Sequence, residues 1–183
     1  MNRYLYPILA STFLVTGLAA TSPANAASDE EIIKSAVSAA PEAVAKDATV
    51  IDVGMDGKVR TVREGKNGWW CMADSPDSPG ADPMCGDQNS LEWAKAWMEK
   101  KEPPKGQVGF IYMLAGGSDA SNTDPYAKGP TETNNWIKTG SHVMIVNATD
   151  LMKGYPQDLK PDTSAPYIMW AGTPYAHLMI PVK

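Results

Sequence analysis

The sequence has few of the residues that build common cross-links and active sites. Its 183 residues include only two cysteines and two histidines. It contains no G-x-S-x-G, no H-E-x-x-H and no glycine-rich phosphate-binding loop, the signatures of α/β-hydrolases, zinc proteases and P-loop nucleotide sites. The motifs therefore support none of these three classes, and any chemistry must rest on a few other side chains.

Positive charge and long apolar runs are scarce as well. The chain has a net charge of −5 and no extended basic run, so nucleic acid and anionic membrane surfaces are not expected partners. After residue 26, no run approaches the roughly 18 apolar residues that a membrane-spanning helix needs. We expect no stable membrane insertion once the N-terminal segment has been removed.

Residues 1–26 have the three parts of a secretory signal peptide. Arg3 supplies a positive start, residues 4–20 are mostly apolar, and the tripeptide ANA at 24–26 is a small-x-small cleavage site. A membrane anchor is the alternative, but the apolar stretch is short and ends in a cleavage signal. The pattern predicts cleavage after residue 26 and a periplasmic or secreted product, residues 27–183.

Cys71 and Cys85 enclose a segment rich in proline and aspartate. In an exported protein, a lone pair of cysteines is expected to form a disulfide. The enclosed segment cannot form a helix or a central strand because it holds Pro76, Pro79 and Pro83, so a covalent bond would order it. A metal-ligating thiolate and a catalytic thiol remain the alternatives, although the spacing is not the C-x-x-C of thioredoxin-like centres.

Capping signals predict two main helices. Ser28 and Glu31 form a capping box ahead of an apolar stripe over 32–40, which Pro41 is expected to end. Asn89 is the expected N-cap of a second helix over 91–101, which ends before two prolines.

Strand signals occur without the regular βαβ order of a parallel sheet. Asp56-Gly57 is a hairpin turn signal between the first two predicted strands. Apolar and β-branched runs bounded by turn residues predict strands at 48–53, 58–63, 108–114, 141–147, 166–170 and 177–182. The sequence therefore predicts a single α+β domain with a mainly antiparallel sheet and two main helices.

Two segments share an order of short motifs. Residues 112–145 contain YM, AG, PYA and HVMI in that order, and residues 167–180 contain YIM, AG, PYA and HLMI. The likeness predicts two similar β-arches built around one centre, and chance matching of short motifs is the alternative. Both histidines of the chain lie in these segments, each followed two positions later by a methionine.

The two His-x-Met pairs are the candidate functional residues. Residues two apart on a strand point to the same face, so His142 would project with Met144, and His177 with Met179. Imidazole and thioether together suit copper, because the soft thioether favours Cu(I). The alternative is a buried core, since methionine commonly fills cores and a buried histidine is commonly hydrogen bonded to the backbone.

Other functions remain open at this point. The polar segment 116–136 is long for a loop in a compact domain, and such loops are often functional. It could form a small-ligand or hydrolase-like site with His177, and an aromatic groove built from the tryptophans is a further possibility. A purely structural role in the cell envelope is a third class. The sequence leaves open whether the protein is an enzyme, and it favours a binding or interaction role.

The strings NGWWCM, DPMC, SDASNTDPYA, SHVMIV and MWAGTPYAHLMIPV carry a family resemblance. The chain resembles a family of short exported bacterial proteins of uncharacterised activity, from about residue 48 to the C-terminus. The resemblance implies one exported domain, and it implies no cofactor or catalytic residue.

Overall fold

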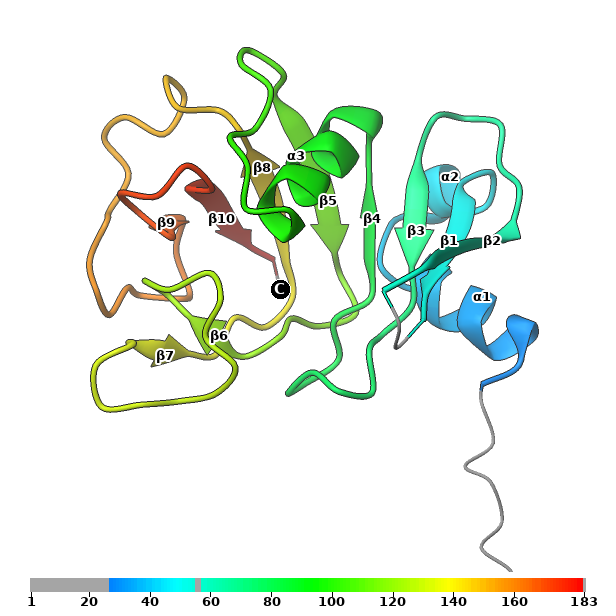
Figure 1. The fold of residues 1–183 in the computed structure, drawn as a ribbon, viewed down its shortest axis with the longest axis horizontal. Helices are drawn as coiled ribbons and strands as arrows, with labels where there is room; N and C mark the ends of the chain where they lie inside the picture. The colour runs from blue at the N-terminus through cyan, green and yellow to red at the C-terminus, as the bar shows by residue number, and fades with distance from the viewer. Residues whose placement is uncertain (1–26, 55–56, 183) are drawn as a thin grey trace, which may run out of the picture.

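The computed structural model describes residues 27–54 and 57–182 and contains one large sheet flanked by helices (Figure 1). The predicted signal peptide over 1–26 and Asp56 of the predicted hairpin turn lie outside the described residues. In chain order the elements are α1 (Asp29–Val37), α2 (Glu42–Ala45), β1 (Thr49–Val53), β2 (Val59–Arg63), β3 (Trp70–Met72), β4 (Met84–Gly86), α3 (Gln88–Met98), β5 (Gly109–Met113), β6 (Ala120–Ser121), β7 (Trp136–Ile137), β8 (His142–Val146), β9 (Tyr167–Met169) and β10 (His177–Pro181).

The main sheet has eight strands in the order β2-β1-β3-β4-β5-β8-β10-β9, and β6 pairs with β7 separately. Every pairing in the main sheet is antiparallel except β1 with β3, which confirms the prediction of a mainly antiparallel sheet. Of the three helices among the described residues, two are long, as expected, and α2 has only four residues. No helix within the described ranges is both long and apolar enough to cross a membrane.

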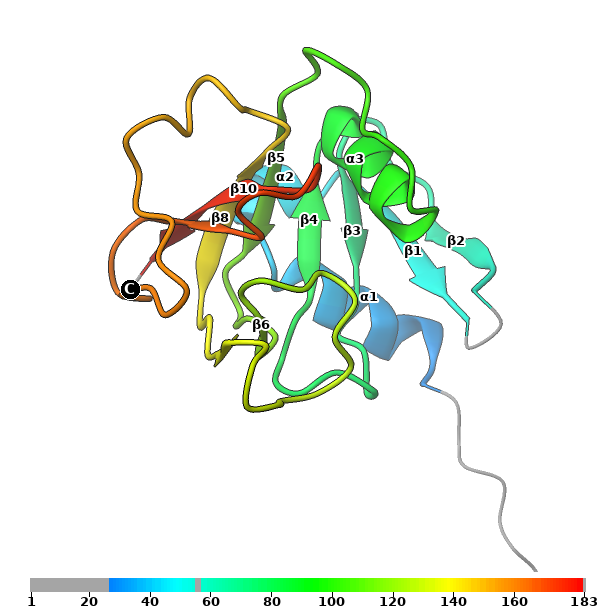
Figure 2. The same ribbon diagram turned by 60° about the vertical axis from the view of Figure 1, so that its left-hand side comes forward.

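Alternation along the strands sorts the core onto two faces. One face buries α1 against a cluster that includes Val50, Cys71 and Cys85. The other face buries Trp93 of α3 against a cluster that includes Ile111 of β5. Figure 2 shows α3 near one end of the central strands and the loop that carries β6 near the other end. The candidate site lies on this second face.

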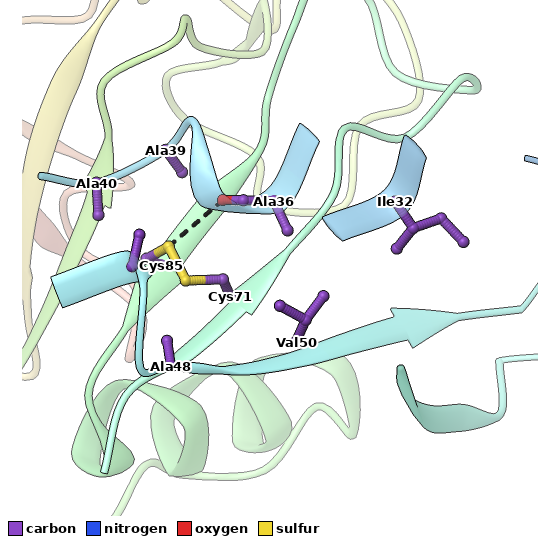
Figure 3. Packing of buried hydrophobic residues seen from close by; sticks show 9 residues of the cluster. Ile32, Ala36, Ala39, Ala40, Ala48, Val50, Cys71 and Cys85 are labelled. Atoms are coloured by element: carbon purple, nitrogen blue, oxygen red, sulfur yellow. Dashed lines mark hydrogen bonds between the residues drawn. A yellow bond between two sulfur atoms is a disulfide. The ribbon is translucent and has the colours of Figure 1, made fainter. Parts of the chain in front are cut away.

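The predicted disulfide is present, and it joins two paired strands. Cys71 on β3 and Cys85 on β4 are register partners with an S–S distance of 2.06 Å. Both are fully buried among small apolar side chains of α1 and β1, and Figure 3 shows the bond beside Ala36 and Ala48. The bond closes the proline-rich segment as a loop that leaves and returns to the centre of the sheet.

Helix α3 approaches the sheet closely because two facing strand positions are glycines. A Cβ on Gly86 would lie 2.2 Å from Ser90 Oγ, and one on Gly109 would lie 2.5 Å from Ser90 N.

Asp87, and not the predicted Asn89, is the N-cap of α3. Its Oδ1 accepts from Ser90 N, and its Oδ2 accepts from Phe110 N. The prediction was wrong because Asp87 can cap the helix and bond the neighbouring strand at once.

The other differences from the sequence-based elements are local. The capping box at Ser28 is present, but α1 ends at Val37, and Pro41 is the N-cap of the short α2. The hairpin predicted around Asp56-Gly57 pairs β1 with β2, with Val53 opposite Val59. Strands β3 and β4 and the β6–β7 pair were not predicted, because each is three residues or shorter and is too short to show a period.

Candidate functional site

A cavity of about 500 Å³ lies over the second face of the sheet. Strands β5, β8, β9 and β10 line its base, α3 lines one side, and the disulfide-closed loop and the 118–128 segment line others. All four predicted site residues line it, and so do three further methionines; the set is Met84, Met113, His142, Met144, Met169, His177 and Met179. Half of the chain's ten methionines therefore border one cavity.

The strand register relates the two His-x-Met pairs by an approximate twofold arrangement. Met144 of β8 lies directly opposite Met179 of β10, and directly opposed residues on neighbouring strands project to the same face. On one side of this central pair, Met113 lies opposite His142; on the other, Met169 lies opposite His177.

The shared motif order thus corresponds to a shared structure. The earlier copy forms the antiparallel pair β5–β8, the later copy forms β9–β10, and the copies meet where β8 pairs with β10.

The register also sets how far the two histidines are offset from each other along the strands. His142 lies opposite Pro181, and His177 lies opposite Val146. The two histidines are therefore four residues apart along neighbouring strands, about 13 Å at the rise of an antiparallel strand. The methionine pair lies between them.

Both imidazoles are held in the same way. His142 Nδ1 lies 2.7 Å from Gly140 O, and His177 Nδ1 lies 3.0 Å from Tyr175 O. A carbonyl can only accept, so in each neutral ring the proton is on Nδ1, and Nε2 keeps its lone pair. Within the described residues, neither Nε2 has a hydrogen-bond partner.

Burial keeps both rings neutral. His177 is 1% exposed and His142 is 2% exposed. Loss of hydration lowers the pKa of His177 to about 4, against the opposing effect of the Tyr175 carbonyl, and the neighbouring His142 lowers it slightly further. Burial also lowers the pKa of His142, opposed by the Gly140 carbonyl. The cavity therefore presents two uncharged imidazoles at neutral pH.

Three tryptophans form a stacked wall next to one of the imidazoles. Trp93 stacks on Trp170 with ring centroids 6.2 Å apart, and Trp97 lies 5.3 Å from Trp170. The His177 ring lies edge-on at 4.8 Å from Trp170 and 5.5 Å from Trp93. Trp93 Nε1 is buried without a hydrogen-bond partner, so this wall also offers an unused donor.

The cavity lining carries more negative than positive side chains. Four aspartates border it, together with one lysine, Lys128; they are Asp77, Asp82, Asp119 and Asp124. Asp82 is partly buried, and burial raises its pKa although the Ser75 amide and the Ser78 hydroxyl oppose the shift. The disulfide-closed loop supplies Asp77 and Asp82, so the disulfide has a direct bearing on this wall.

The hydrolase-like alternative at the 116–136 segment has less support from the geometry. Ser121 Oγ donates to Asn134 O, and among the described residues no hydroxyl is hydrogen bonded to either imidazole. Asp124 and Ser121 take part in local turn hydrogen bonds, in which Ser121 Oγ accepts from Asp124 N and Asp124 Oδ1 accepts from Tyr126 N. Across residues 27–54 and 57–182, no three of the His, Cys, Asp and Glu side chains are grouped to hold a metal ion.

Sequence reasoning missed Met84, Met113 and Met169 as parts of the site, and it named the tryptophans only as a possible aromatic groove. Met113 and Met169 occupy equivalent places in the two copies of the motif, just before Leu114-Ala115 and Trp170-Ala171. That equivalence was the available signal. Met84 and Trp93 carry no such signal, because only the folded sheet brings them to this face.

Comparison with known proteins adds no relative: no family model, no curated protein and no solved structure matches the chain.

Proposed function

We propose that the protein is an exported binding protein that holds Cu(I) in the cavity over β8 and β10. The observation that carries the proposal is the set of donors at the base of the cavity. Two neutral imidazoles with free Nε2 atoms flank the opposed pair Met144 and Met179. Thioether and imidazole donors without thiolates favour Cu(I) among the common biological metals.

The way the imidazoles are held also favours metal binding. A ligating histidine commonly donates its other ring N–H to a carbonyl or carboxylate, which fixes the tautomer and the ring orientation. His142 and His177 both donate Nδ1–H to a backbone carbonyl. With the pKa of His177 near 4, a proton does not compete with the metal for its Nε2 at neutral pH.

The arrangement of the cysteine, histidine and carboxylate side chains argues against zinc. Zinc sites use cysteine, histidine and carboxylate ligands, and within the part of the chain that the structure describes no three of these are grouped together. Both cysteines are already joined to each other. The acidic lining of the cavity would still attract a cation toward its mouth.

Cu(I) is therefore expected to stabilise the protein against heat, and Zn(II) is not. Preferential binding to the folded state at a free concentration of about 100 times Kd should raise the melting temperature by about 5–10 °C. Calorimetry under anaerobic conditions, with a copper chelator as buffer and a reductant free of thiols, measures the shift.

The matched variants are Met179→Leu in the cavity and Met152→Leu in the separate cluster on the opposite face. Both keep the side-chain volume. Only Met179→Leu should reduce the shift. An unchanged melting temperature of the wild-type protein in Cu(I), or equal shifts in all three proteins, would contradict the proposal.

A second candidate function is the binding of a small organic cation. The specific observation is the combination of a cavity of about 500 Å³ with a stacked tryptophan wall and four aspartates against one lysine. Pockets of this size hold small molecules, and aromatic rings attract ammonium groups. The apolar body would lie against Trp93, Trp97 and Trp170, and the charge would lie near the carboxylates.

Phenethylamine, 2-phenylethanol and 3-phenylpropionate test this second candidate, because they share a phenyl ring and differ in charge. Titration calorimetry at low salt should rank the cation first, at least about tenfold tighter than the anion. The preference should shrink with added salt and in an Asp77→Asn/Asp119→Asn variant. Equal affinities for the three compounds would contradict the proposed attraction between the ligand's positive charge and the aspartates.

A further inference from the structure

We infer that the cavity holds two Cu(I) ions, one beside each imidazole, at sites related by the approximate twofold arrangement of the strands. The inference rests on the proposed function and extends it to the number and position of the ions. One site is formed by His142 with Met113 and Met144. The other is formed by His177 with Met169 and Met179.

Each site has the same three donors in the same relative positions. In each, one methionine lies directly opposite the histidine, on β5 for His142 and on β9 for His177, and the second lies two residues further along the histidine's own strand. Directly opposed side chains have Cβ atoms about 5 Å apart, which flexible thioethers can bridge to a shared ion. In each, the histidine donates Nδ1–H to the carbonyl two residues before it.

A single ion bound by both imidazoles does not suit this register. The Cα atoms of the two histidines are offset by about 13 Å along neighbouring strands, and Met144 and Met179 lie between them, whereas a single shared ion would need a nitrogen of each ring about 2 Å away. Rings tied to Gly140 O and Tyr175 O cannot swing freely toward the centre. Each imidazole therefore binds its own ion. Of the central pair, Met144 belongs to the His142 site and Met179 to the His177 site.

The two sites differ in what surrounds them, and the difference makes them separately observable. His177 lies against the rings of Trp93 and Trp170. His142 lies under the 116–140 segment, where a Cβ on Gly117 would come within 2.9 Å of His142 Cε1. Among the described residues, His142 makes no ring contact with a tryptophan. An ion beside His177 should change the indole emission, and an ion beside His142 should not.

The test combines stoichiometry with fluorescence on residues 27–183 of the protein, expressed as an exported product with its disulfide intact. Native mass spectrometry after Cu(I) loading should give two ions per chain. Met113→Leu/Met144→Leu should bind one ion and keep the change in tryptophan emission. Met169→Leu/Met179→Leu should also bind one ion and should lose that change. Met152→Leu is the control for loss of a buried methionine outside the cavity, and circular dichroism checks that each variant is folded.

The outcomes separate the two ideas. One ion per wild-type chain, lost in both double variants, overturns the two-site inference and leaves Cu(I) binding in place. No bound ion overturns both. Two ions that neither double variant reduces would place the metal elsewhere and would also overturn the inference.

Discussion

Replacing both cysteines by alanine is expected to lower the free energy of unfolding by about 3 kcal/mol. The bond spans a sequence separation of 14, and closing a loop of about 15 residues removes roughly that much chain entropy from the unfolded state in the chain-entropy model. Both cysteines are fully buried in the α1 cluster, so the lost sulfur packing acts in the same direction. Urea denaturation at neutral pH measures the change.

Asp77→Asn is the matched control, because it lies on the same loop and is exposed. It should leave the free energy of unfolding within about 0.5 kcal/mol of the wild-type value. A decrease of under about 1 kcal/mol in the double-alanine variant would contradict the entropic role assigned to the bond. Because the closed loop also lines the cavity, the same variant should bind Cu(I) more weakly even where it remains folded.

Acid is expected to destabilise the protein between pH 7 and pH 4. Burial lowers the pKa of His177 from 6.5 to about 4, so in this range the unfolded chain binds a proton that the folded chain does not. The stabilisation is complete above pH 6.5 and is lost as the pH falls, and it amounts to about 3 kcal/mol for this one group. His142 acts in the same direction, because burial lowers its pKa too.

Asp82 on the cavity wall contributes to the pH dependence of stability with the opposite sign. Burial raises the pKa of Asp82, so the folded state gains a proton before the unfolded state does and is favoured as the pH falls toward 4. Urea denaturation of the wild type at pH 7, 5.5 and 4.5 should still show a net loss. His177→Gln keeps the site uncharged and should flatten the curve. A wild-type stability that is constant from pH 7 to 4.5 would mean that His177 is far more hydrated than its burial indicates.

Local signals in the sequence predicted the local parts of the fold. Ser28 with Glu31 located the start of α1 because the two halves of a capping box are only three positions apart in the sequence. The presence of only two cysteines, together with the predicted secretory signal, led to the prediction of the disulfide that the structure contains. The period of two along a strand placed His142 with Met144, and His177 with Met179, since that rule needs no knowledge of the partner strand.

Long-range pairing could not be predicted in this way. Nothing near Met113 indicates that β5 will lie beside β8 with His142 opposite, because register is decided by packing across the whole sheet. The parallel pairing of β1 with β3 is likewise a result of the crossover through β2. The cavity itself depends on where two loops and α3 come to lie, so its tryptophan wall and its acidic lining are properties of the fold.

The strand order has a consequence for association between molecules. An eight-stranded sheet that does not close has two edges, and an uncovered edge can recruit a strand from another chain. At β9 the backbone is already occupied, since Ile168 N donates to Pro156 O and Trp170 N donates to Asn122 O. At β2 the edge carries the half-exposed Arg60, which is ion-paired with Asp29 and Asp52, and an incoming strand would have to desolvate these charged groups. Each end of the sheet therefore has its own protection against aggregation, by coverage at β9 and by charge at β2.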